Sequence, residues 1–159
     1  MPDSGLLRYT HTVPTPLPNF EDDGNLPPGL YSADWEEVRA TFATTPRRRV
    51  LMERLQRLHS LAEATGFLER FVVFGSFVTT KPEPGDIDVI LVMGTGFQSS
   101  QAPLETRALF DHEQADAQFG ASVFWIRTDL LILETVDEFL DYWQTRRDGQ
   151  RRGIIEVRQ

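Results

Sequence analysis

The chain of 159 residues contains no cysteine. This absence excludes a disulfide framework, a zinc–thiolate site and a cysteine nucleophile. Long apolar runs are missing as well, since none approaches the ~20 residues that cross a bilayer. The N-terminus also lacks the charged and then apolar pattern of a signal peptide. We therefore expect no membrane partner and a cytoplasmic location.

Positive charge is scarce too: 16 Lys and Arg stand against 24 Asp and Glu, and the formal net charge is −8. This balance disfavours a protein that binds nucleic acid over its whole surface. The arginines nevertheless gather in a first arginine stretch (Arg47, Arg48, Arg49, Arg54 and Arg57) and a second arginine stretch (Arg146, Arg147, Arg151 and Arg152). Solvated faces are the simplest interpretation of both, but either stretch also suits a nucleotide, an RNA end or an acidic partner.

The length predicts one domain, over residues 31–159, with a core of ordinary size. Residues 1–30 are expected to form an extended arm, because five prolines forbid a regular helix there: Pro14, Pro16, Pro18, Pro27 and Pro28.

Apolar periodicity predicts helices over 33–42, 103–119 and 135–143, and a longer one from Thr45 and Pro46 to Gly66. Ser32 is expected to cap the first helix. Strands are predicted over 70–74, 87–93, 122–127 and 153–157, of which 89–92 is apolar enough to be covered on both faces. The order of elements indicates an α+β or α/β layered domain.

The most informative segment is 71–93, FVVFGSFVTTKPEPGDIDVILVM. Gly75 and Ser76 follow one apolar strand, and Asp86 and Asp88 open the next strand after nine intervening residues. Strand alternation predicts that the two aspartates point to the same side. Two adjacent carboxylates repel each other unless a divalent cation lies between them. A Gly-Ser turn offers N–H groups and a hydroxyl to phosphate oxygens.

A simpler interpretation of the same segment is a tight hairpin turn over 82–86, with Asp86 capping the turn and Asp88 exposed at a sheet edge. This interpretation explains Asp86. It does not explain Asp88, which directly precedes the continuous apolar run.

The pattern Gly75-Ser76, nine residues, Asp86-x-Asp88 resembles the signature of the nucleotidyltransferase fold of the DNA polymerase β superfamily. The short chain is similar to the minimal nucleotidyltransferases of prokaryotic toxin–antitoxin and defence loci. The resemblance implies an α+β fold with a small mixed sheet flanked by helices.

The resemblance also implies roles for these residues. Gly75 and Ser76 would contact nucleotide phosphates, while Asp86 and Asp88 would bind the Mg²⁺ or Mn²⁺ that accompanies a nucleoside triphosphate (NTP). The implied reaction moves a nucleoside monophosphate to a hydroxyl, and pyrophosphate leaves. Lys81, in the intervening loop, is a further candidate for a cationic contact with the triphosphate.

Active members of that superfamily usually carry a third carboxylate on a neighbouring strand, and here Ser122 is expected at that place. Serine is neutral and a poor Mg²⁺ ligand. The possible substitutes are Glu156 on the last strand and Asp116 or Glu113 on the preceding helix. Two hypotheses stay open: an active enzyme that modifies a protein or RNA hydroxyl, and an inactive nucleotidyltransferase-fold protein that binds a partner, as an antitoxin does.

The remaining histidines and tryptophans suggest no site of their own. His59 and His112 are expected as helix-surface residues and not as metal ligands, because no pair of histidines has metal-ligand spacing. Trp35, Trp125 and Trp143 are expected in the core or on a partner-binding surface.

Overall fold

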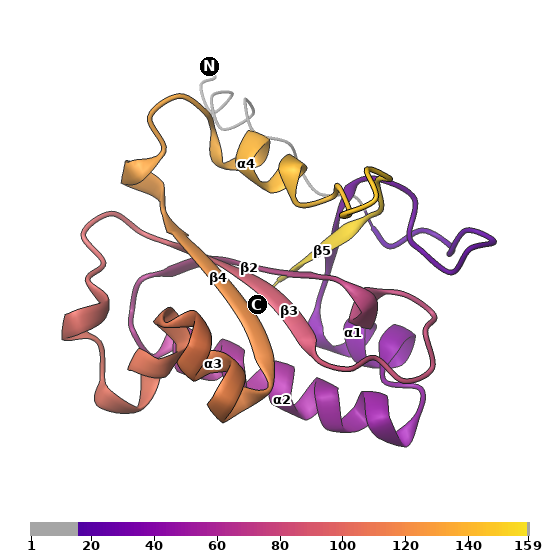
Figure 1. Ribbon diagram of the computed structural model, residues 1–159, viewed down its shortest axis with the longest axis horizontal. Coiled ribbons are helices and arrows are strands. Elements are labelled where there is room, and N and C mark those ends of the chain that lie inside the picture. Colours follow the sequence, from indigo (N-terminus) through magenta and orange to yellow (C-terminus); the bar gives the residue numbers. More distant parts are fainter. Residues whose placement is uncertain (1–15, 159) are drawn as a thin grey trace, which may run out of the picture.

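A five-stranded mixed sheet forms the centre of the computed structural model, which describes residues 16–158 (Figure 1). Half of the predicted arm, residues 1–15, and residue 159 lie outside the described residues. The strands are β1 (Leu30–Ala33), β2 (Leu68–Phe74), β3 (Ile87–Met93), β4 (Ala121–Arg127) and β5 (Ile154–Val157), in the order β1-β5-β2-β3-β4. β2 is antiparallel to β3 and β5, whereas β1 runs parallel to β5 and β3 parallel to β4. The predicted mixed α+β class is therefore confirmed.

Strand β1 was not predicted from the sequence. Ser32 was expected to cap the first helix. Ser32 lies within the strand, and Asp34 caps the helix instead. Asp34 accepts a hydrogen bond from the Glu37 backbone N–H at 2.8 Å, and Glu37 accepts one from the Asp34 N–H at 3.0 Å. The strand forms because Leu30 pairs with Ile154 near the other end of the chain. No local pattern reveals such a long-range pairing.

Within residues 16–158, four α-helices flank the sheet: α1 (Trp35–Phe42), α2 (Pro46–Glu63), α3 (His112–Phe119) and α4 (Val136–Tyr142). Thr45 caps α2 and Pro46 begins it, as the sequence predicts. The helix predicted over 103–119 is divided into a 3₁₀ segment, Leu104–Phe110, and α3. The division falls at Asp111, which is extended and whose side chain caps α3 by accepting from the Gln114 N–H.

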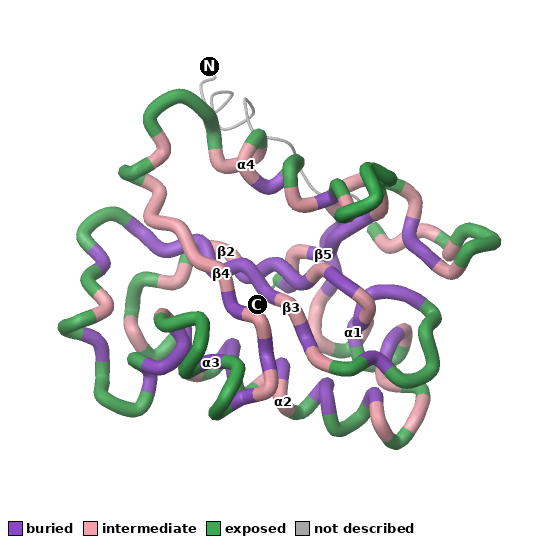
Figure 2. The backbone as a smooth tube through the Cα atoms, viewed as in Figure 1, coloured by how far each residue is buried: buried purple, intermediate pink, exposed green. Residues whose placement is uncertain are grey.

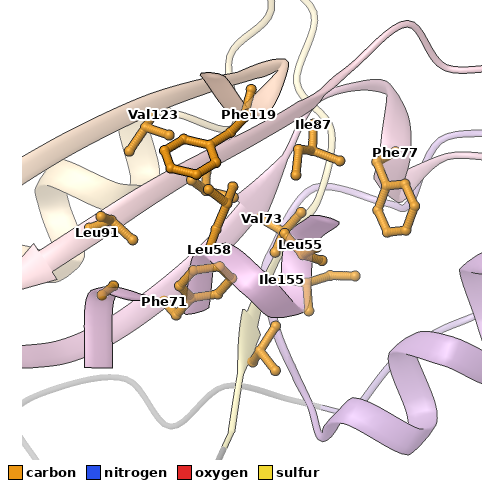
Figure 3. Close-up of a cluster of buried hydrophobic side chains, with 14 of the residues drawn as sticks. Leu55, Leu58, Phe71, Val73, Phe77, Ile87, Leu91, Phe119, Val123 and Ile155 are labelled. Carbon is orange, nitrogen blue, oxygen red and sulfur yellow. The ribbon is translucent and has the colours of Figure 1, made fainter. Parts of the chain in front are cut away.

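The helices cover the two faces of the sheet unequally. Helices α1, α2 and α3 lie on one face, and α4 alone lies on the other (Figure 1). The larger core fills the first face, where side chains of β2, β3 and β4 meet α2 and α3 (Figure 3). A smaller cluster, with Val72, Ile90, Val92, Leu140 and Ile154 at its centre, lies under α4.

Burial follows this arrangement and is deepest along the central strands (Figure 2). Residues 89–92 of β3 are fully buried, as their continuous apolar run predicts. Val89 and Leu91 pack into the larger core, while Ile90 and Val92 pack under α4. Among the described residues, no helix is both long and apolar enough to cross a membrane.

Candidate functional site

Asp88 is held between two strand neighbours and a glycine. In the sheet register it lies opposite Phe74 on β2 and Ser122 on β4. Gly75, directly after β2, adopts φ 80°, which L side chains rarely adopt. A Cβ atom on Gly75 would also overlap the Asp88 carboxylate. Both conformation and space therefore require glycine here, and the carboxylate packs directly against the backbone of the Gly-Ser turn.

A pocket of about 780 Å³ opens above this point, and its lining includes Gly75, Ser76, Asp88 and Ser122. The structure thus brings three of the predicted site residues into one cavity, together with the serine expected at the third-carboxylate position. Lys81 lines a second pocket of about 430 Å³, which adjoins the first because both are lined by Ser76, Arg146 and Arg152.

Two other groups of residues in the lining of the larger pocket differ in chemistry: one is positively charged and the other is aromatic. An arginine cluster (Arg146, Arg147 and Arg152) contributes positive charge from the second arginine stretch. An aromatic wall (Phe74, His112, Phe124, Tyr142 and Trp143) lines the pocket from β2, α3, β4 and α4. The described part of the chain thus combines a carboxylate, a hydroxyl, guanidinium groups and rings around one cavity.

The environment of Asp88 disfavours its charge. Burial, and then the negative charge of Asp86, raise the pKa of Asp88 to about 6. A hydrogen bond from the Ser122 hydroxyl and the charges of Arg152 and Arg147 act in the opposite direction. A carboxylate with a raised pKa in a pocket is a typical feature of a functional site.

Asp86 lies outside the lining of the larger pocket, within the electrostatic influence of charged side chains of α2 and α3. It precedes the first residue of β3. Burial and the charge of Asp116 raise its pKa, while Arg47, Arg54 and Lys81 lower it. Because Asp86 also raises the pKa of Asp88, the two carboxylates are close enough to repel each other.

The two aspartates suit a Mg²⁺ site that is completed by a phosphate ligand, but not a metal site formed by protein side chains alone. Mg²⁺ commonly binds through one or two carboxylates, while substrate phosphates and waters complete its shell. Asp88 supplies one carboxylate from the pocket lining, and Asp86, which lies close enough to repel it, is the candidate for the second. Their mutual repulsion would fall on binding a cation. Within residues 16–158, no group of three or more acidic, histidine or cysteine side chains could hold a metal by itself. The site therefore fits a cation that arrives with a phosphate ligand.

The candidates for a third carboxylate lie elsewhere. Glu156 on β5 receives a bond of 2.6 Å from Arg70, which also binds Asp137 at 2.9 Å. Glu156 thus belongs to an ion-pair network and does not line the pocket. Asp116 influences Asp86, and Glu113 is exposed on α3.

The first arginine stretch holds the loop between the Gly-Ser turn and the aspartates. The Arg48 side chain is only 2% exposed and donates hydrogen bonds of 2.6–3.3 Å to five backbone carbonyls, those of Phe42, Ser76, Phe77, Thr79 and Lys81. All its hydrogen-bond acceptors among the described residues are carbonyl oxygens. Burial lowers its pKa. Arg48 thus fixes the path of the loop that follows Ser76.

Arg47 and Thr45, which lie near Arg48 in sequence, bind the same loop closer to Asp86. Arg47 donates to the carbonyls of Pro84 and Gly85, and the Thr45 hydroxyl donates to the Pro82 carbonyl. The beginning of α2 therefore positions both ends of the nine-residue loop. Of the two interpretations of the first arginine stretch, a solvated face is wrong for Arg48.

Sequence reasoning missed His112 and Tyr142 as pocket residues and only indicated the arginine cluster. The clustering of arginines over 146–152 was the available signal. His112 was expected on a helix surface; it is exposed there, and it also lines the pocket. The expectation of a helix-surface position is wrong for His59. Its ring is buried between Trp35 and Phe71, with centroid distances of 5.2 and 5.0 Å.

Comparison with known proteins places the chain in one family. A family model described as "Family of unknown function (DUF6932)" matches residues 18–158, so the chain belongs to this family. Neither curated proteins nor solved structures gave a match.

Proposed function

We propose that this chain binds an NTP with Mg²⁺ or Mn²⁺ in the larger pocket and transfers its nucleotidyl group to a hydroxyl of a protein or RNA. The observation that carries the proposal is the joint lining of one pocket by Gly75, Ser76, Asp88 and the arginine cluster. A resemblance of the Gly-Ser and Asp-x-Asp pattern to the nucleotidyltransferase fold of the DNA polymerase β superfamily supports it.

The pocket suits a triphosphate in size and charge. A volume of about 780 Å³ lies within the range of small-molecule sites. Backbone N–H groups at the Gly-Ser turn and the Ser76 hydroxyl are suited to phosphate oxygens. Arg146 and Arg152 line both pockets, so a triphosphate could extend past Ser76 towards Lys81. Arginine is well matched to phosphate because its planar fork donates two parallel hydrogen bonds.

The proposed step is an in-line displacement at the α-phosphorus. The acceptor oxygen forms a bond to that phosphorus while the bond to the α–β bridging oxygen breaks. Pyrophosphate leaves with the electron pair, and the arginine cluster stabilises its charge. The hydroxyl proton passes to water, because Ser122 is no base. A bound Mg²⁺, held by Asp88 and Asp86, would neutralise phosphate charge and orient the triphosphate.

A second candidate is a catalytically inactive protein of the same fold that binds a partner, as an antitoxin does. The observation that favours it is Ser122, which lies opposite Asp88 on β4 where an active member would carry an acid. Nucleotide binding would be retained under this hypothesis, while transfer would be lost.

Labelling with α-³²P NTPs separates the two candidates. The full chain is incubated with each of the four NTPs, Mg²⁺ and pools of RNA and protein acceptors. Transfer predicts label on an acceptor, and Asp88→Asn should reduce it at least ~100-fold, a magnitude typical of lost electrostatic stabilisation. Glu105→Gln, an exposed substitution on the 3₁₀ segment, serves as the matched control.

Binding of an NTP without any labelling would favour the inactive binding protein. If no NTP binds to the folded wild-type chain, both candidates are wrong.

A further inference from the structure

We infer that the aromatic wall of the larger pocket stacks the nucleobase of the bound nucleotide, with Tyr142 and His112 as the accessible stacking residues. This inference rests on the proposed function and adds the part of the ligand that the Gly-Ser turn and the aspartates do not contact. It predicts a ligand that is both polyanionic and aromatic.

The aromatic wall has a packed base and an accessible edge. Phe74, Phe124 and Trp143 are half-buried and pack together, with centroids 5.1 Å apart for Phe74 and Trp143 and 4.7 Å for Phe124 and Trp143. These three rings close the second core under α4. Their contacts with one another explain their presence without any ligand.

Tyr142 and His112 are not explained in this way. Tyr142 is the last residue of α4 and is 69% exposed, and its ring meets Trp143 edge-on at 5.9 Å. His112 begins α3, is exposed, and lies 5.3 Å from the Phe124 ring. Both side chains line the same cavity as Ser76 and Asp88. Two exposed rings at the opening of a charged cavity are suited to an aromatic ligand.

The charge of the pocket narrows the class of ligand. The arginine cluster favours an anion, and the aromatic wall offers stacking, which is favourable for every base because each has a π-face. A lipid tail or an apolar peptide would offer no anion to these three arginines, which outnumber the two carboxylates of the same lining, Asp88 and Asp148. A nucleotide satisfies both sides, with its phosphates at Ser76 and Arg152 and its base at Tyr142.

The test compares an NTP with inorganic triphosphate, which carries similar charge and no base. Isothermal titration of the full chain with Mg²⁺ measures each of the four NTPs and inorganic triphosphate separately. We expect the best NTP to bind about tenfold or more tightly than inorganic triphosphate, since stacking one base contributes ~1–3 kcal/mol.

Tyr142→Ala should weaken the NTP by about fivefold or more and leave inorganic triphosphate unchanged, and His112→Ala should act in the same direction. Tyr142→Phe keeps the ring and should recover the NTP affinity that Tyr142→Ala loses. Glu105→Gln, exposed and outside the pocket lining, is the matched control. Tyr142 and His112 are both exposed, so their variants should fold.

Equal affinity of wild type for the NTP and for inorganic triphosphate would overturn the inference and leave the proposed function intact. Equal weakening of both ligands by Tyr142→Ala would overturn it as well. Binding of neither ligand would contradict the proposed function itself and the inference with it.

Discussion

Arg48 and Arg152 belong to two arginine stretches that resemble each other in sequence, but their surroundings differ in the folded chain. Arg48 is buried and donates to five carbonyl groups of the protein itself. Arg152 lines two pockets, and its described side-chain hydrogen bond goes to Asn25 at 3.2 Å. All described acceptors of Arg48 are thus carbonyls of the protein, whereas Arg152 has a single described side-chain acceptor and keeps other donors for a ligand. Its neighbours Arg146 and Arg151 pair with Asp148 and Asp141. A cluster of arginines therefore indicates function only after its acceptors are known.

The largest effect that the comparison predicts is on stability at Arg48. Arg48→Met removes a buried donor from five carbonyls, of which that of Ser76 still accepts from Thr79. We expect the free energy of unfolding to fall by about 3–5 kcal/mol. Urea denaturation measures the loss. Arg49→Met, one residue further on the same helix and exposed, is the control and should change stability by less than ~0.5 kcal/mol. Similar losses in both variants would contradict the structural role of Arg48.

The next effect concerns the carboxylate near the arginine cluster. Folding raises the pKa of Asp88 from 3.8 to about 6, so the folded state binds the proton more tightly than the unfolded chain does. The contribution of Asp88 to stability is therefore full below pH ~4 and is lost as pH rises to ~6.

Asp88→Asn should accordingly be more stable than wild type at pH 7, by at most ~3 kcal/mol. The difference should shrink as the pH falls from ~6 to ~4. Thermal unfolding across this pH range measures it, and Glu105→Gln should show no such trend. A variant less stable than wild type at pH 7 would show that the Asp88 charge is well compensated in the free protein.

For Arg152 we predict a small loss of stability and a large loss of ligand affinity, whereas for Arg48 we predict a large loss of stability. Arg152→Met should change the free energy of unfolding by less than ~1 kcal/mol, because burial and Arg146 already lower the pKa of this guanidinium. The affinity for an NTP with Mg²⁺ should fall by about 10–100-fold, as expected for a lost charged hydrogen bond. Titration calorimetry and urea denaturation on the same sample separate the two effects. If Arg152→Met loses stability but keeps its affinity for the NTP, Arg152 has a structural role like that of Arg48 and does not bind the ligand.

The smallest effect is expected at Arg47, whose carbonyl acceptors Pro84 and Gly85 lie in the loop before Asp86. Arg47→Met should lower the free energy of unfolding by only about 1 kcal/mol, because water can replace its partly exposed hydrogen bonds. Hydrogen exchange at the amides of residues 83–88 should nevertheless accelerate. Unchanged exchange there would remove Arg47 from the set of residues that position the loop.

The sequence predicted those helices and strands that are determined by neighbouring residues. Thr45 and Pro46 mark the start of α2, and the apolar run 89–92 marks a strand buried on both faces. Strand β1 could not be predicted, because it depends on pairing with β5. The 3₁₀ segment before α3 depends on an extended Asp111 within an otherwise helical pattern.

The candidate site was predictable only where its residues lie close together in the sequence. Gly75 and Ser76 directly follow β2, and Asp88 lies on β3, the next strand of the chain, so their spacing indicates a shared site. His112 and Tyr142 reach the pocket from two distant helices, and only the packing around β4 and α4 brings them there. Glu156 was a candidate by its strand alone, and its bond to Arg70 could not be read from spacing.

The central claim is that the pocket at Asp88 binds a nucleoside triphosphate together with a divalent cation. A crystal structure of the full chain with a non-hydrolysable NTP analogue and Mn²⁺ tests it most directly, because Mn²⁺ is located by its anomalous signal. We predict one Mn²⁺ at ~2.1–2.3 Å from a carboxylate oxygen of Asp88, with phosphate oxygens against Gly75 and Ser76. An analogue ordered elsewhere, or a pocket without Mn²⁺ at saturating concentrations of both, would contradict the claim.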